Sequence, residues 1–390
     1  MKWKFYSLAF VAGMSILTAC SSDDNNDNDG NGGNGNGNEI ENGTILKGTI
    51  TSDVTLAAGN TYKLSGEYIV EEGGTLHIEE GVKIIAVYDD IADYILVKQG
   101  GKINAVGTPD KPIVMTSEKE EPGAWGGIHI CGRAHTNAEG GKGSSEIGGA
   151  VYGGNDDADN SGTLQYIRLE YTGFAFDEEH EANGISFYGV GNGTIVDHCQ
   201  AYKGSDDGFE FFGGSVNVSN LVAVSCSDDS FDWTEGWNGK GTNLVAYQEA
   251  ESTLGYDCDC LMECDNNGSN NAATPVAHPV LKNLILVGNG GSKQGIRLRA
   301  GTEVEIDNAK VCGKGQPLTV ETALTENALK NGTSKLTNIT LTSELSSKEG
   351  IYTHADFIAV TSNKVDANLS YSSFEDIRKE CSWMNGSWVK

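Results

Sequence analysis

The chain has 390 residues, of which 52 are glycine, 55 are acidic and 27 are basic, and its formal net charge at pH 7 is −28. A charge this negative disfavours nucleic acid and anionic lipid surfaces as partners, because both repel an acidic surface. The many glycines stand between short apolar runs, a pattern that excludes a long-helix protein and favours a β-rich fold with frequent turns.

The first twenty residues have the pattern of a targeting segment. Lys2 and Lys4 give a positive start, residues 5–17 are mostly apolar, and Ala19 and Cys20 close the run. This run is too short for a membrane span and is typical of a signal peptide over residues 1–19. A cysteine directly after it resembles the bacterial lipoprotein signal, which implies a lipid on Cys20 and the membrane as a partner through that anchor. The alternative is an ordinary signal peptide with a chance cysteine.

Residues 20–44 are predicted to form a flexible tether. Residues 21–29 are acidic and polar, and no apolar side chain occurs from residue 21 to residue 38, so this stretch cannot bury a core. Acidic residues directly after a lipidated cysteine resemble the surface-export signal of Bacteroidetes-type lipoproteins. That resemblance implies the cell outer membrane with the protein facing the exterior; the alternative is a spacer on a periplasm-facing lipoprotein.

Residues 45–390 show no second linker and are predicted to form one domain. A motif of the type Asn-Leu-Val-Ala starts at His198, Asn220 and Asn243, which are 22 and 23 residues apart, and returns at Asn283 and Asn338. The longer gap before Asn283 indicates an insertion. A period near 22 with more than one short strand predicts an all-β, right-handed parallel β-helix with short helical and loop insertions. Asparagines at one repeated position are expected to form a hydrogen-bonded ladder.

A second motif runs in phase with the first and sets the direction of the side chains. It reads small, apolar, polar, apolar at 127–130, 184–187, 208–211, 230–233 and 295–298. Because side chains alternate along a strand, the apolar members are predicted to point into the core and the polar members outward. The best helix candidate is 318–330, closed by Asn331 and Gly332.

Three blocks of the chain resemble a known family. Residues 153–168, 205–214 and 228–232 are similar to those of uncharacterised Bacteroidetes surface lipoproteins with a right-handed parallel β-helix. The resemblance extends over nearly the whole mature chain. It implies the fold and the location, and it implies no activity.

A weaker resemblance connects the chain with polygalacturonase-type β-helix hydrolases. Those enzymes place an Asp on one coil and an Asp pair on the next, and here Asp207 and the pair Asp228-Asp229 stand in that relation. Arg297-Leu298-Arg299 takes the place of their basic sugar-binding motif. Their Gly-His-Gly has no counterpart, since residues 233–248 contain no histidine.

The polar members of the second motif predict a candidate site on one outward sheet face. Adjacent coils of a β-helix stack about 4.8 Å apart, so Glu210 and Asp232 are expected to be neighbours that can share a cation. About 5 Å is also the carboxylate separation of a retaining glycosidase. The alternative is an ordinary solvated acidic face, on which His129 and Ser186 also lie. The candidate catalytic or ligand-binding residues are Asp207, Glu210, Asp229, Asp232 and Arg297.

A second candidate calcium site lies in the turn at 157–162. Asp157, Asp159 and Ser161 place oxygen ligands at the first, third and fifth positions of a loop, and a glycine follows. Arg168 stands at the twelfth position, which excludes an EF-hand. The prediction is a looser Ca²⁺-binding turn; the alternative is a polar turn that joins two coils.

Three cysteines are predicted to form disulfides that staple the insertion at about 249–279. Cys258, Cys260 and Cys264 lie within seven residues, and an exported protein meets an oxidising compartment. Zinc binding by the thiolates is the alternative.

Three residues beside the acidic face are candidates for ligand binding. Trp237 lies in a predicted turn, where its ring can stack on a sugar or cap the end of a coil. Arg297 and Arg299 are the basic candidates.

These features favour three functions. The first is a surface protein that binds extracellular glycans or adheres to surfaces, with Ca²⁺ as its cofactor. The second is a polysaccharide hydrolase or lyase that acts on the outward face, which the missing histidine disfavours. The third is a structural component of a surface coat.

Overall fold

The structure is a computed structural model that describes residues 38–89, 91–176 and 180–390, all within one compact unit of the chain. The signal segment, Cys20 and most of the tether lie outside the described residues. Residues 38–44 are a correction to the predicted tether. Strand β1 (Asn38–Ile40) pairs with β3 (Val54–Leu56), because Ile40 is the first apolar side chain able to pack against the core. Among the described residues, no helix is both long and apolar enough to span a bilayer.

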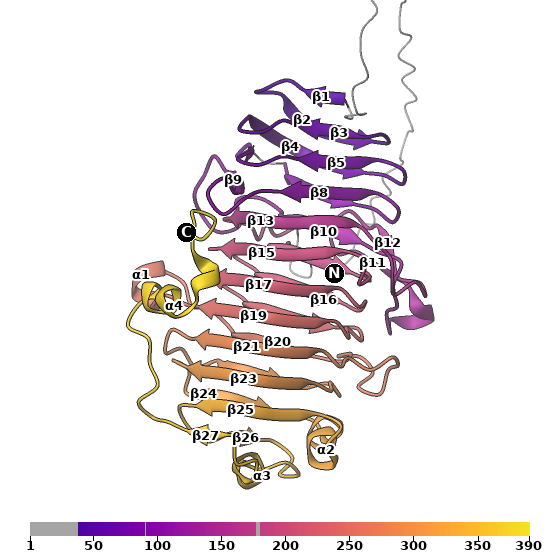
Figure 1. Ribbon diagram of the computed structural model, residues 1–390. Helices are drawn as coiled ribbons and strands as arrows, with labels where there is room; N and C mark the ends of the chain where they lie inside the picture. Colours follow the sequence, from indigo (N-terminus) through magenta and orange to yellow (C-terminus); the bar gives the residue numbers. More distant parts are fainter. Residues whose placement is uncertain (1–37, 90, 177–179) are drawn as a thin grey trace, which may run out of the picture. The chain divides into compact units, whose positions relative to one another are not determined.

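Parallel strands stack from coil to coil along the whole unit, as Figure 1 shows, and this confirms the predicted all-β parallel β-helix. The long-strand ladder consists of β13 (Gly162–Glu170), β15 (Ile195–Tyr202), β17 (Asn217–Val224), β19 (Lys240–Tyr247), β21 (Val280–Val287), β23 (Glu305–Cys312) and β25 (Lys335–Leu341). The short-strand ladder consists of β10 (Ile128–Cys131), β14 (Ile185–Tyr188), β16 (Phe209–Phe212), β18 (Phe231–Thr234), β20 (Met262–Cys264), β22 (Gln294–Leu298) and β24 (Gln316–Val320).

The two ends of the stack use strands of more varied length, from the ten residues of β4 to the two residues of β26 and β27. The N-terminal coils contain β2 (Ile45–Ile50), β4 (Thr61–Val70), β5 (Thr75–Ile78), β6 (Lys83–Ala86), β7 (Tyr94–Val97), β8 (Lys102–Val106) and β9 (Ile113–Ser117). The last coil contains β26 (Ser346–Ser347) and β27 (Lys364–Val365). Strand β13 pairs with both β8 and β9, one on each side of Tyr166, so every long strand contributes to two faces of the coil.

The bend within each long strand explains the repeated asparagine. The residue at the bend has a positive φ, between 51° and 63°, at Tyr166, His198, Asn220, Asn243, Asn283, Asn308 and Asn338. Asparagine tolerates this left-handed conformation better than most residues. The side chains form the predicted ladder: Asn243 Nδ2 donates to Asn220 Oδ1 at 2.8 Å, Asn283 to Asn243 at 3.1 Å, and Asn308 to Asn283 at 2.9 Å.

The apolar members of the second motif fill the core, as the alternation predicts. The rings of Phe187 and Phe211 stack with centroids 5.0 Å apart, and those of Phe209 and Phe231 lie 5.6 Å apart. Stacked aromatic pairs of this kind stabilise a core beyond the area that they bury. The neighbouring polar side chains therefore point away from the core.

The helices are short and lie outside the coils: α1 (Glu251–Leu254), α2 (Ala323–Asn331), α3 (His354–Ala359), α4 (Phe374–Glu380), and the 3-10 turns Glu139–Gly141 and Ser382–Met384. The helix predicted at 318–330 begins only at Ala323. Leu318 and Val320 instead continue the short-strand ladder, where both are buried. The helix ends as predicted, with Gly332 in the left-handed conformation.

The C-terminal segment, residues 374–390, runs along the outside of the long-strand ladder and is yellow in Figure 1. Trp388 is fully buried against Tyr166 and His198, and the backbone N–H of Lys390 donates to Gln200 Oε1 at 2.8 Å. This segment covers apolar side chains of the sheet that would otherwise be exposed.

Candidate functional site

The outward positions of the short strands stand in one row, which we call the outward ladder. The strand register sets Glu210 beside Asp232, Asp232 beside Glu263, and Glu263 beside Arg297. His129 and Ser186 precede Glu210 in the same register. Glu210 and Asp232 are therefore neighbours, as the repeat predicts.

An acidic pocket opens over this ladder. It has a volume of about 200 Å³, and its lining consists of carboxylate residues: Glu146, Glu181, Asp206, Asp207, Glu210, Asp228 and Asp232. No lysine, arginine or histidine is among the described residues that line it. Glu146 comes from the excursion between β11 (Gly143–Ser144) and β12 (Val151–Tyr152), which packs beside the ladder. Asp206 and Asp207 are buried, whereas Glu181 and Asp228 are exposed, so the acidic face is recessed on one side and open to solvent on the other.

Asp207 and Asp229 hold the turns in front of the short strands together. Asp207 Oδ1 accepts the backbone N–H of Asp229 at 2.8 Å, and Asp229 Oδ1 accepts that of Cys260 at 2.6 Å. Both side chains are buried, at 5 % exposure each. Burial and the neighbouring carboxylates raise the pKa of both groups well above the usual aspartate range.

Glu210 and Asp232 differ in their partners. Glu210 Oε2 accepts a hydrogen bond from Asn183 Nδ2 at 2.6 Å, whereas Asp232 Oδ1 is buried without a hydrogen-bond partner among the described residues. Burial and like charges raise the pKa of both carboxyls well above their usual ranges. His129 does not compensate, because burial lowers its pKa to about 4 and leaves the ring neutral at pH 7.

The pocket carboxylates are close enough together to hold a cation. Asp207, Glu210 and Asp232 each offer an oxygen within 4.8 Å of the others, and so do Asp206, Asp207 and Asp228. Oxygen ligands of this kind suit hard divalent cations, and Ca²⁺ in particular tolerates an irregular carboxylate set.

The two arginines lie beyond the pocket, and carboxylates already neutralise them. Arg297 pairs with Glu263 at 2.9 Å and with Glu321 at 3.3 Å, while Arg299 pairs with Glu263 and with Asp265. The positive charges of the two arginines therefore compensate the negative charge of Glu263. The unbalanced part of the ladder is therefore the part inside the acidic pocket.

The predicted calcium turn is engaged in hydrogen bonds that hold two segments together. Asp157 Oδ1 accepts from His135 Nδ1 at 2.6 Å, and Asp159 Oδ2 accepts the backbone N–H of Arg133 at 2.9 Å. Ser161 is buried, and its N–H donates to Thr194 Oγ1. These hydrogen bonds fit a turn that joins two coils, which is the alternative interpretation. The calcium site stays a prediction.

Trp237 is a correction, because its side chain belongs to the core. It is 1 % exposed, its ring stacks on Phe211 at 4.2 Å, and its indole N–H donates to the carbonyl of Val216 at 3.2 Å. A ring covered in this way cannot receive a sugar. The turn closes inward because the small residues Gly236 and Gly239 flank the tryptophan.

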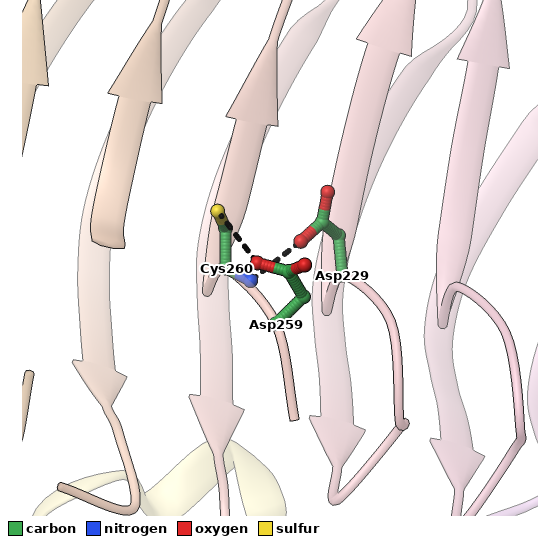
Figure 2. Close-up of side chains that lie close together, drawn as sticks. All are labelled: Asp229, Asp259 and Cys260. Carbon is green, nitrogen blue, oxygen red and sulfur yellow. Dashed lines mark hydrogen bonds between the residues drawn. The ribbon is translucent and has the colours of Figure 1, made fainter. Parts of the chain in front are cut away.

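The predicted disulfides are also corrected, since the eight cysteines of the described residues are free and buried. Figure 2 shows Cys260 beside Asp229 and Asp259: its thiol donates to Asp259 Oδ1 at 3.3 Å, and its backbone N–H donates to Asp229 Oδ1 at 2.6 Å. The three side chains offer ligand atoms within 4.8 Å of one another, so zinc binding by Cys260 stays a prediction. Burial and nearby acids raise the pKa of the Cys260 thiol, which is therefore protonated at pH 7 while no cation is bound. A bound metal ion would remove that proton, because a coordinating thiol is deprotonated.

The sequence interpretation missed several residues of the site. Glu263 continues the outward ladder, and its run Met262-Glu263-Cys264 has the apolar-polar-apolar signature, hidden behind the insertion. Asp206 directly precedes a predicted residue. Glu146 and Glu181 lie on excursions without periodicity, so no signal in the sequence could place them at the pocket.

The comparison with family models agrees with the architecture. A family model for pectate-lyase-like β-helix domains matches residues 48–389. Among solved structures, the crystal structure of the Dettilon tailspike protein aligns with a TM-score of 0.30 and 9 % identity, over 76 % of this chain and 52 % of that chain, so the present chain spans about half of the tailspike's length. The comparison with curated proteins gave no match. Since the family model covers most of its length, the chain belongs to the family of pectate-lyase-like β-helix domains.

Proposed function

We propose that this protein binds carbohydrate through a divalent cation, Ca²⁺ in the first place, held in the acidic pocket. One observation carries the proposal: seven acidic residues line a pocket of about 200 Å³ without a basic side chain among the described lining residues. A cation in the pocket balances their charge and keeps open coordination positions for sugar hydroxyl or carboxylate oxygens.

The electrostatics of the pocket support a bound cation. Burial, together with Asp228 and other acids, raises the pKa of Asp206 to about 8, and burial raises that of Glu146 to about 7. At neutral pH the pocket without a cation therefore keeps protons on carboxyl groups that would be ionised in water. A divalent cation replaces those protons, so its binding is coupled to proton release.

The family description supports carbohydrate as the ligand, because it relates the domain to pectate lyases. An acidic polysaccharide is repelled by a chain with a net charge of −28 unless a cation bridges the two. The proposed cation provides that bridge.

The proposed location is the cell outer membrane, with a lipid on Cys20 and the β-helix facing the exterior. The support is the signal pattern ending at Cys20 and the resemblance to Bacteroidetes surface lipoproteins. The Cys20→Ala protein should move from the membrane fraction to the soluble fraction. Protease added to intact cells should degrade the wild-type protein; protection would place it on the periplasmic side.

A hydrolase or lyase is the second candidate, favoured by the Glu210 and Asp232 pair. Neighbouring positions on parallel strands lie about 4.8 Å apart, close to the spacing of the two carboxyls in retaining glycosidases. A structural coat component is the third candidate and would need no ligand.

The test is binding to a panel of acidic and neutral polysaccharides in Ca²⁺ or in EDTA, with new reducing ends and unsaturated ends measured in parallel. The variant Glu210→Gln plus Asp232→Asn removes two pocket charges, and Glu305→Gln plus Asp307→Asn removes two charges on β23 as a matched control. Retention that needs Ca²⁺ and fails only in the pocket variant supports the proposal. New chain ends would make the protein an enzyme. Calorimetry that detects no Ca²⁺ binding would overturn the proposal.

A further inference from the structure

A second cavity lies on a different part of the coil, between the asparagine ladder and the C-terminal segment. It has a volume of about 310 Å³, within the range of small-ligand sites. We call it the asparagine groove. Its polar and aromatic lining consists of Asn243, Asn283, Asn308, Lys310, Glu380, Ser382 and Trp383, and Val245 and Ile285 are among its apolar residues.

The amides of the groove have hydrogen-bonding capacity left over. An asparagine side chain has two N–H donors and a carbonyl oxygen with two lone pairs. The ladder uses one donor and one lone pair of Asn283, which donates to Asn243 and accepts from Asn308. Asn283 and Asn308 are exposed, so their remaining donors and acceptors face the groove or solvent. Successive coils repeat this pair of groups about every 4.8 Å along the axis of the β-helix.

Trp383 gives the groove an aromatic wall. It is half-buried, whereas Trp125, Trp233, Trp237 and Trp388 are all buried. Its ring packs against the apolar cluster beneath the C-terminal segment, 6.2 Å from the ring of Trp388. An indole that is fixed on one side and accessible on the other is a surface on which a sugar ring can stack.

The charges of the groove are balanced, in contrast to those of the acidic pocket. Lys310 pairs with Glu380, whose other oxygen accepts from the hydroxyl of Tyr371 at 2.8 Å. The other lining residues are neutral. A charged ligand gains no counter-charge here, so a neutral polar ligand fits best.

We infer that the asparagine groove is a second carbohydrate site, which binds a neutral oligosaccharide without a cation. The amides of Asn283 and Asn308 bind sugar hydroxyls, and Trp383 stacks on a sugar ring. The glycan lies along the β-helix axis because the amides repeat in that direction. This site is separate from the proposed function of the acidic pocket and does not require it.

The test is tryptophan fluorescence of the full chain in EDTA, titrated with xylohexaose, cellohexaose and mannohexaose as neutral probes and with hexagalacturonate as an anionic probe. Because Trp383 is the half-buried tryptophan among the described residues, an emission change reports on the groove. We expect at least one neutral probe to bind and hexagalacturonate to remain without effect.

Three variants locate the binding. Trp383→Leu keeps the apolar packing and should weaken binding about tenfold or more, measured by calorimetry because the reporter is lost. Asn308→Gly should also weaken it. Asn338→Gly is the matched control, since it changes the asparagine at the same bend of the next long strand, at the same kind of positive φ, where the side chain donates to Asp307 and lies outside the groove. Thermal melting must show that all three fold.

The proposal is distinguished from the acidic pocket by the variant Glu210→Gln plus Asp232→Asn, which should bind the neutral probe like the wild type. No binding of any neutral probe at millimolar concentration would overturn the inference. Equal affinity of Trp383→Leu, Asn308→Gly and the wild type would overturn it as well, whatever the acidic pocket binds.

Discussion

Asp207 accepts the backbone N–H of Asp229 from the next coil at 2.8 Å, although both aspartates lie in the most acidic region of the described chain. Asp229 repeats the contact with Cys260 at 2.6 Å. These carboxylates therefore hold the turns of three successive coils together. Asp207 also lines the acidic pocket in which the proposed cation would bind, so its structural role and its charge can be tested separately.

Replacement of Asp207 separates its two roles. Asp207→Ala leaves the N–H of Asp229 buried without an acceptor and should lower the free energy of unfolding by about 1–3 kcal/mol. Asp207→Asn keeps an acceptor oxygen and cannot carry a negative charge, so it should be at least as stable as the wild type in EDTA at pH 8. Urea unfolding measures both. Equal losses in the two variants would contradict the hydrogen-bonding role.

The pocket should make stability fall as pH rises in the absence of a cation. The pKa of Asp206 is raised to about 8 in the folded state, so the folded chain binds more protons than the unfolded chain between about pH 4 and pH 8. His129 has the opposite effect between its lowered pKa of about 4 and its unfolded value near 6.5. The clear window is therefore pH 6.5 to 8.

Thermal melting in EDTA should show a decrease in Tm across that window, and a smaller decrease for Asp206→Asn. Ca²⁺ should raise Tm most at pH 8, where fewer protons compete with it. A wild-type Tm that rises from pH 6.5 to 8, or a Ca²⁺ effect that is strongest at pH 6.5, would contradict this prediction.

The asparagine ladder should be sensitive to the type of substitution at Asn243, whose φ is 60°. Asn243→Gly loses the ladder hydrogen bonds, each worth about 0.5–1.5 kcal/mol. Asn243→Ala loses the same bonds and adds about 1–2 kcal/mol for the left-handed conformation. Chemical unfolding should rank the wild type above Gly and Gly above Ala. An alanine variant as stable as the glycine variant would show that the conformation carries no cost.

The eight cysteines should behave as inaccessible thiols. Burial raises the pKa of Cys131, Cys226 and Cys258 to about 12, so little thiolate exists at pH 8. In the Cys20→Ala protein, maleimide should label none of the eight in the native state and all eight after denaturation without reductant. Mass spectrometry counts the labels. Fewer than eight labels after denaturation would indicate a disulfide, which the structure contradicts.

The fold could be predicted from the sequence because a β-helix repeats. The coil step between Asn220 and Asn243 and the alternation in Phe209-Glu210-Phe211 each report a local rule that every coil obeys. Such rules place Glu210 beside Asp232 without knowledge of the rest of the chain. The repeat length of the sequence therefore predicts which residues of adjacent coils lie side by side, but it predicts no other tertiary contact.

The pocket could not be predicted in full, since its cover does not repeat. Glu146 reaches the site from an excursion whose path depends on contacts such as that of the Tyr188 hydroxyl, which donates to Glu146 Oε2 at 3.1 Å. Trp237 is predicted to be accessible because turn residues surround it. Its ring instead stacks on Phe211 in the core, a contact between coils that the local sequence does not indicate. Proximity of Cys258, Cys260 and Cys264 in sequence likewise says nothing about which way each thiol points.

The C-terminal segment has a mechanical consequence. In a solenoid each coil contacts only its neighbours, so unfolding can proceed one coil at a time from either end. Here Ser387 contacts Pro109 and Arg168, while Glu380 pairs with Lys310, so one stretch of chain spans the coils from β9 to β23. This segment links coils that are not neighbours in the stack. Under tension we therefore expect the coils outside the linked block to unfold one by one and the linked block to unfold cooperatively. The acidic pocket lies on coils within that block.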